Sequence, residues 1–320
     1  MIITINNTSA FWVMVQKEIT DTVRSWKFLI MGLILLLTCS ASLYSALSDF
    51  STVVKLSKSN DFFFLRIFTH SSDALPSFIV FVSFIGPLLG ISMGFEAINS
   101  EQSKGTLSRI LAQPVYRDYI LNAKFTASLI VLSALFIFIT LVVVGFGLLL
   151  IGIPPTFDEV LRLFVFSLIN IIYVGFWLNL SIFFSVKFKQ SATSALSGLA
   201  LWIFFTIFFG IIINVLAQSM APSIYASENT IVAYQSFIQN VNRINPVQLF
   251  NEAVNTVLMP TVRTLGPLSR AEKIGTLPSI LPLQESIFLI WPHITALISA
   301  CISLFGFSYY YFMRKEIRSR

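Results

Sequence analysis

Charged residues are scarce in this chain. Only 11% of its 320 residues are Asp, Glu, Lys or Arg, whereas 56% are hydrophobic and 32 are phenylalanine. A soluble domain carries roughly 25% charged residues, so this composition excludes an ordinary soluble fold and predicts a membrane protein. The net charge of +6 does not indicate nucleic-acid binding, because the basic residues are scattered along the chain.

Cysteine and histidine are also rare, with two of each. Cys39 and Cys301 fall inside apolar runs, which argues against a disulfide framework. His70 and His293 are isolated in the sequence and do not suggest a His-rich metal site. We interpret His293, after Trp291–Pro292, as a polar residue at the membrane interface; a proton relay or a ligand is the alternative. No catalytic, cofactor-binding or metal-binding residue is predicted.

A nucleotide-binding motif is lacking as well. A P-loop needs Gly-x-x-x-x-Gly-Lys-Ser/Thr, and SKGTLS, residues 103–108, has these letters in another order without the upstream glycine. If the protein uses ATP, we expect another chain to bind it.

Charge deep inside the apolar runs, which ion-coupled carriers usually need, is sparse. Glu96 and Arg162 lie toward the ends of their runs, and mid-run polar residues such as Asn170 and Asn179 are neutral. Such neutral groups usually bond neighbouring helices. The chain therefore lacks the residues to power transport by itself. A self-sufficient secondary transporter or channel, and a membrane-embedded enzyme or scaffold, remain as alternatives.

Long apolar runs dominate the rest of the sequence. A membrane helix needs ~20 mostly apolar residues, and six runs qualify: 28–47, 77–98, 126–153, 160–186, 195–217 and 286–312. We expect an all-α polytopic membrane protein with one domain, residues 1–320. The second run contains Gly86, Pro87, Gly90 and Gly94, which predicts a kink or close packing against a neighbour.

Lys and Arg predict the orientation. An even number of spans places both termini on one side, and the short loops and tails of that side hold more basic residues. The positive-inside rule makes that side cytoplasmic. Residues 99–118 are then cytoplasmic, residues 218–285 are extracytoplasmic, and the expected location is the cell membrane.

Two segments outside the runs have helical amphipathic patterns. In residues 8–27, one narrow face holds Trp12, Val15, Ile19, Val23 and Trp26, and the other holds Lys17, Glu18, Asp21 and Arg24. This is typical of an interfacial helix in the headgroup plane; a merely solvated helix fits the two tryptophans less well. In residues 245–258, Asn245 is a candidate N-cap before Pro246. We expect a short helix at the outer membrane surface, acting as a lid on the bundle or as a substrate contact.

The polar segment NSEQSKGTLSRILAQPVYRDY, residues 99–119, separates the second and third runs. Gly105 permits a sharp turn, and Thr106 can cap the helix that follows. Leu107, Ile110 and Leu111 form the apolar face of that helix, and Pro114 ends it. A helix this short is marginal alone, so it must rest on lipid headgroups or on another protein; the residues alone leave both open.

The stretch FEAINSEQSKGTLSRILAQPVYRDYILNAKF resembles the signature of permease subunits of type-2 ATP-binding-cassette (ABC) transporters. The matching positions are Glu96, Glu101, Gly105-Thr106-Leu107, Pro114 to Arg117, and Lys124. QKEITDTVRSWKFL, INPVQLF and FMRKEIR also look like family features, so the resemblance covers the chain. The order of elements is similar to permeases of nitrous-oxide reductase maturation and of sodium or antibiotic export. Lys104 departs from the pattern, which often has an acidic or small residue there.

The resemblance implies the transmembrane permease subunit of an ATP-driven exporter. Residues 101–113 would be a coupling helix that docks in a groove of a separate ATPase subunit, which binds ATP and Mg, and residues 8–27 would lie alongside. Two permeases, identical or paralogous, and two ATPases would form the working unit in the lipid bilayer.

The implied coupling residues are Glu96, Glu101, Gly105, Thr106, Leu107, Arg109, Ile110, Pro114 and Arg117, and the interfacial-helix residues are Trp12, Lys17, Glu18, Arg24 and Trp26. Glu96, Glu101 and Arg117 would brace the segment by ion pairs and caps. Leu107 would contact the ATPase, so that Leu107→Asp uncouples hydrolysis from transport.

Overall fold

The computed structural model describes residues 10–48, 62–71, 75–112, 116–152, 154–223, 225–261, 265–266 and 281–314. Within these ranges the regular structure is helical, and six helices are long and apolar enough to cross a membrane. The predicted all-α fold with six spans is therefore confirmed.

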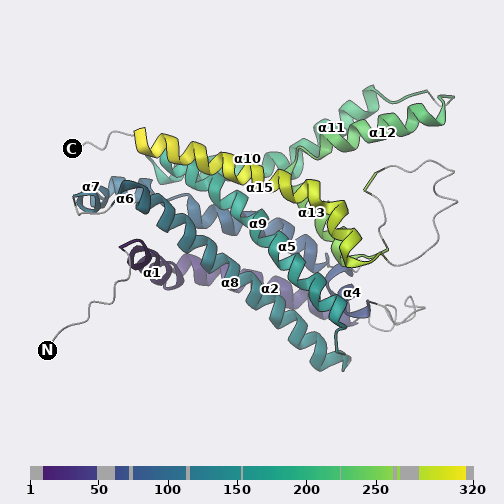
Figure 1. Ribbon diagram of the computed structural model, residues 1–320, viewed down its shortest axis with the longest axis horizontal. Coiled ribbons are helices and arrows are strands. Elements are labelled where there is room, and N and C mark those ends of the chain that lie inside the picture. The colour runs from purple at the N-terminus through teal and green to yellow at the C-terminus, as the bar shows by residue number, and fades with distance from the viewer. Residues whose placement is uncertain are drawn as a thin grey trace.

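The spans alternate with shorter helices. The candidate spans are α2 (Trp26–Ser48), α5 (Phe78–Gly94), α8 (Arg117–Ile151), α9 (Phe157–Lys187), the continuous α10 (Ser191–Ile203), η1 (Phe204–Phe208) and α11 (Phe209–Ser219), and α15 (Leu283–Arg314). The shorter helices are α1 (Ala10–Val23), α4 (Phe63–Thr69), α6 (Asn99–Ser103), α7 (Thr106–Leu111), α12 (Glu228–Asn242) and α13 (Pro246–Leu258). Helices α1, α6 and α7 gather at one end of the bundle and α4 and α13 near the other, while α11 and α12 run away from it (Figure 1).

Helix α9 lies at the centre of the bundle and contacts α5, α8, α10, α13 and α15. Two glycines of α5 face its backbone: a Cβ on Gly90 would lie 2.9 Å from the Val174 carbonyl oxygen, and one on Gly94 would lie 2.8 Å from the Leu178 carbonyl oxygen. Ser181 of α9 donates a hydrogen bond to the Ile91 carbonyl, at 2.9 Å. The predicted close packing of this run is confirmed, since only glycine allows so near an approach.

Helix α13 is packed into the bundle. Its Pro246 start and Asn245 N-cap are confirmed, but Phe250 is fully buried and stacks on Tyr173 of α9, with ring centroids 4.2 Å apart. Its two apolar rows are both buried: Leu249, Ala253, Val257 and Phe250, Val254, Leu258. A face that wide needs protein on more than one side, so the expected packing of this helix on the bundle is confirmed. Its expected level at the outer membrane surface stays a prediction.

Asn245 joins α13 to the π-helical segment η1 of the fifth span. Its Oδ1 accepts from the Val247 N–H at 2.9 Å, and its Nδ2 donates to the Phe205 carbonyl at 2.7 Å. Asn245→Ser should keep an N-cap but lose the bond to Phe205, so amide exchange in residues 204–208 should speed up. Asn245→Ala should lose both the N-cap bond and the bond to Phe205, and the lost cap should lower the free energy of unfolding by a further ~1 kcal/mol. Hydrogen-exchange mass spectrometry checks this; unchanged exchange in both variants would contradict it.

Arg162 of α9 is fully buried, and its guanidinium is bound on several sides. It pairs with Asp158 at 2.7 Å and donates to the carbonyls of Val257 and Leu281 at 2.9 and 2.7 Å. These bonds tie α9 to the end of α13 and to Leu281, which lies just before the start of α15. Removing one of these partners would leave a buried charge uncompensated, which is strongly destabilising. Arg162 therefore has a structural role.

The Glu252 carboxylate of α13 accepts hydrogen bonds from three side chains, those of His293, Arg243 and Gln248. His293 Nε2 lies 2.7 Å from Oε2, Arg243 Nε donates to Oε2 at 2.9 Å, and Gln248 donates to Oε1 at 2.9 Å. His293 is 3% exposed and faces α13, while its predicted level at the membrane interface stays a prediction. Burial alone would raise the pKa of Glu252, but the bonds from His293, Gln248 and Arg243 lower it to about 2.

This carboxylate should make stability depend on pH. Because its folded pKa lies below the ordinary 4.5, Glu252 stabilises the folded state fully above that value, and the contribution is lost as pH falls toward 2. Between pH 6 and 3, wild type should lose about 2 kcal/mol of unfolding free energy relative to Glu252→Gln. Thermal melts between pH 6 and 3 check this; parallel curves for the two proteins would contradict it.

Candidate functional site

The polar segment between α5 and α8 folds as two short helices. Gly105 separates α6 from α7 with a left-handed φ of 68°, so its predicted turn is confirmed. The short helix expected after this turn is confirmed as α7, while Glu101 lies in the separate helix α6, so the segment implied for coupling is divided into two helices. Thr106 is not the cap: Gly105 occupies that position, and the Thr106 hydroxyl donates to the Glu101 carbonyl at 3.2 Å. Pro114 lies outside the described residues.

The start of α6 is fixed to α9 and α10. Ser185 Oγ accepts from the backbone N–H groups of Ile98 and Asn99 at 2.9 and 3.2 Å, and Ser191 donates to Asn99 Oδ1 at 3.0 Å. Ser185 and Asn99 are buried. These positions were missed by sequence reasoning, because single serines and an asparagine separated by more than 80 residues have no local pattern.

Leu107 points into the protein. It is 1% exposed and belongs to the main hydrophobic core, and Ile110 packs partly against the same core. The predicted contact of Leu107 with an ATPase is therefore wrong: the apolar face of α7 is used for mounting the helix. Leu107→Asp would damage this core, so it cannot report on docking. The exposed residues of the segment are Ser103, Lys104, Gly105, Arg109 and Ala112.

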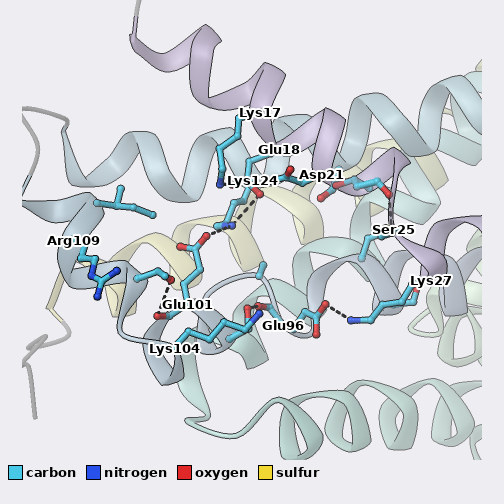
Figure 2. A pocket seen from close by; sticks show the side chains of 18 residues that line it. Lys17, Glu18, Asp21, Ser25, Lys27, Glu96, Glu101, Lys104, Arg109 and Lys124 are labelled. Carbon is cyan, nitrogen blue, oxygen red and sulfur yellow. Dashed lines mark hydrogen bonds and ion pairs between the residues drawn. The ribbon is translucent and has the colours of Figure 1, made fainter.

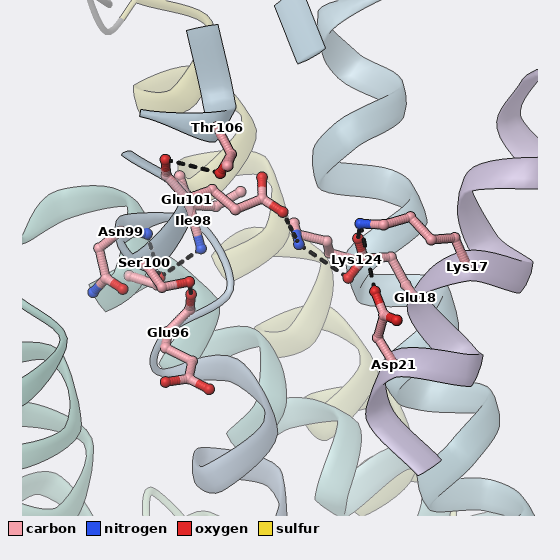
Figure 3. Close-up of polar contacts among 11 residues, drawn as sticks. Lys17, Glu18, Asp21, Glu96, Ile98, Asn99, Ser100, Glu101, Thr106 and Lys124 are labelled. Atoms are coloured by element: carbon pink, nitrogen blue, oxygen red, sulfur yellow. Dashed lines mark hydrogen bonds and ion pairs between the residues drawn. The ribbon is translucent and has the colours of Figure 1, made fainter. Parts of the chain in front are cut away.

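Lys124 of α8 links α6 to α1. Its ammonium lies 2.7 Å from Glu101 Oε1 and 3.0 Å from Glu18 Oε2, and the Lys124 side chain is 10% exposed (Figure 3). Lys17 lies 3.1 Å from the other Glu18 oxygen. Burial alone would raise the pKa of Glu18, but the charges and hydrogen bonds of Lys124 and Lys17 lower it. We call Glu18, Lys124 and Glu101 the charge bridge; Lys124 was noted in the sequence motif but not predicted as a site residue.

A second ion pair joins α2 to the end of α5. Lys27 pairs with Glu96, and its ammonium also lies 4.9 Å from the centre of the Phe95 ring. Between this pair and the charge bridge is a cleft of about 580 Å³. Figure 2 shows charged side chains of α1, α2, α6 and α7 around it. Residues of α5 and α8 line the cleft as well, so it lies where six helices meet. The two sets of ion pairs link the α6–α7 segment to α1, α2 and α8 around it.

Arg117 is directed to the end of α15. Its Nη2 donates to the Phe312 carbonyl at 2.6 Å, and its guanidinium carbon lies 5.1 Å from the centre of the Phe312 ring. Arg117 thus ties α8 to α15, and its predicted bracing of the α6–α7 segment stays a prediction. The corresponding ties of Glu96 and Glu101 go to α2 and α8.

Helix α1 packs along α8. Val15 is buried against Ala123 and Ala127, whose small side chains let the two helices come close. Trp12 and Trp26 are 51% and 80% exposed. Helix α1 ends at Val23 and Trp26 begins α2, so the predicted stripe over residues 8–27 is divided between two helices. Glu18 turns toward α8 and away from the solvated side, while Arg24 is exposed.

Comparison with known proteins identifies the family. A family model described as ABC-2 family transporter protein matches residues 12–317. The chain is also similar to a probable ABC transporter permease protein, NosY, of Pseudomonas aeruginosa, with 23% identity over 205 residues that cover 62% of this chain and 67% of that protein. With its six candidate spans, the chain thus belongs to the ABC-2 family of transporter proteins and is a membrane permease subunit of an ABC transporter.

Proposed function

We propose that this permease belongs to an exporter and that its ATPase subunit binds the α6–α7 turn. The observation that supports this is an exposed turn whose flanking residues are bound to the spans by ion pairs and hydrogen bonds, which we call its mounting. Lys104 and Arg109 are exposed, while Glu101, three residues before Lys104, is held by Lys124 of α8 at 2.7 Å. A force on the turn would be transmitted to the third span.

The mounting reaches several helices. Lys124 connects α8 with α1 through Glu18, and Ser185 connects the start of α6 with α9. The pair of Lys27 and Glu96 connects α2 with the end of α5. Closure of the ATPase subunits around ATP would displace the turn, and these fixed ties would make α2, α5, α8 and α9 move together. ATP and Mg are bound by the ATPase in this proposal.

The proposal also covers topology and assembly. Both termini and the α6–α7 turn face the cytoplasm, because the short loops and tails on that side carry more Lys and Arg. The exposed Trp12 and Trp26 rings lie at the headgroup level of the cell membrane, where tryptophan is enriched. A second permease copy, identical or paralogous, completes the substrate pathway.

An ion-coupled carrier is less well supported. In the described parts of the six spans, the buried charged side chains are Lys124, Glu159 and Arg162. Glu159 accepts from the Phe64 N–H at 2.8 Å and from the Thr156 N–H at 2.7 Å, and the other two have the ion pairs described above. Charges bound this firmly connect helices, whereas a coupling site must release and rebind its ion.

Purification from native membranes tests the proposal. The tagged wild type, extracted in mild detergent, should bring down a stoichiometric P-loop ATPase. Gly105→Val should retain much less of it, because a β-branched residue strains the left-handed turn, while the yield of permease stays the same. A permease that purifies alone and supports ion-driven flux in ATP-free liposomes would favour the carrier.

A further inference from the structure

The outward side of the α6–α7 turn is positively charged. Within residues 99–112, the exposed charged side chains are Lys104 and Arg109. The acidic residue of this segment, Glu101, has only 14% of its side chain exposed and is bound to Lys124. The charge bridge therefore removes the negative charge from the outer surface and leaves two cations five residues apart on either side of Gly105.

These cations lie beyond the membrane-spanning part of the bundle. Helix α8 begins at Arg117, whereas its uninterrupted apolar sequence begins after Lys124. Eight residues at 1.5 Å each correspond to about 12 Å of helix outside the apolar core. Figure 1 shows α7 at the tip of this end, beyond the start of α2. A turn at this distance from the lipid faces a protein in the aqueous phase more readily than it faces headgroups.

We infer that the ATPase groove that receives this turn carries carboxylates opposite Lys104 and Arg109. This inference rests on the proposed function, and it adds the chemistry by which the permease selects its ATPase. Exposed charge pairs at an interface contribute modest affinity, but they steer association and reject partners of like charge. An ATPase with a basic groove would be excluded by the same two residues.

A zero-length carbodiimide crosslink tests the contact itself. The reagent joins a lysine amine directly to a carboxylate as an amide, so in the isolated permease–ATPase complex Lys104 should crosslink to an Asp or Glu of the ATPase, as read by mass spectrometry. Lys104→Arg should abolish this crosslink yet retain the ATPase, because arginine keeps the charge without a reactive amine. A complex in which Lys104 forms no crosslink to the ATPase would overturn the inference.

Charge reversal tests the energetic effect. The double variant K104E/R109E should bind the ATPase about tenfold or more weakly at low salt, and the difference from wild type should shrink as salt rises. K187E/K189E is the matched control, because Lys187 and Lys189 are exposed at the end of α9 and in its link to α10, at the same end of the bundle, and the net charge changes by the same amount. Its affinity should stay near wild type.

The possible failures are distinguishable. If wild type retains an ATPase and K104E/R109E retains it equally at low salt, the inference fails while the proposed function stands. If wild type retains none, the proposed function fails. If K187E/K189E weakens binding as much as K104E/R109E, the two cations act only through net charge. If K104E/R109E loses only its binding to vesicles with anionic lipid, they bind a lipid surface. Either result would show that the inference is wrong.

Discussion

Gly94→Ala should destabilise the permease, whereas the same substitution at Gly145 should not. A Cβ on Gly94 would lie 2.8 Å from both the Leu178 carbonyl oxygen and Ser181 Cβ, and none of the atoms around Gly145 comes within 4 Å of such a Cβ. Backbone cannot rotate aside as a side chain can, so α5 and α9 must separate. Overpacking of this kind costs about 1–3 kcal/mol, and we expect a value near the upper end.

The measurement is the free energy of unfolding of both variants, from detergent-denaturation curves of the purified permease. Gly145→Ala should change it by no more than about 1 kcal/mol, and in the stabilising direction, because alanine is the better helix former. Gly94→Val should cost more than Gly94→Ala. Equal effects at the two glycines would contradict the close approach of α5 and α9.

Lys124→Met should have the second large effect. It leaves Glu18 and Glu101, with 18% and 14% of their side chains exposed, without their shared cation. Breaking a buried pair by removing one partner costs about 3–5 kcal/mol, and the nearby Lys17 should place this loss at the lower end. Lys189→Met, at an exposed position, is the matched control and should be close to neutral.

A double-mutant cycle separates the charge bridge from general damage. Glu101→Gln, Lys124→Met and the combination should show a coupling of about 1–3 kcal/mol, because the two residues are in direct contact. The readout is again the free energy of unfolding. Additive effects would show that the pair does not hold α6 to α8, and the mechanical role proposed for it would be lost.

The spans were predictable from the sequence because each depends on a local property. A run of ~20 apolar residues is enough to identify a membrane helix, and Gly90 and Gly94 already indicated close packing. The π-helical segment Phe204–Phe208 was not predictable. One of its carbonyls, that of Phe205, is bound by Asn245, a residue 40 positions away, and no local pattern reports such a bond.

The α6–α7 segment shows the same limit at the candidate site. The spacing of Leu107 and Ile110 correctly indicated an amphipathic helix, but periodicity does not say what covers the apolar face, and here it is the permease itself. Glu18 and Lys124 are 106 residues apart, so their pairing follows from the packing of α1 on α8. Conversely, the turn at Gly105 was predictable, because glycine lacks a Cβ and adopts a positive φ without steric cost.

Hydrogen exchange across residues 99–112 tests the central claim most directly. The amides of the permease would be compared with and without its bound ATPase subunit, and again with ATP. We expect slower exchange at residues 103–109 in the complex, with a further change on adding ATP. A complex that forms but protects only other parts of the permease, such as the link between α9 and α10, would contradict the role of the α6–α7 turn in coupling.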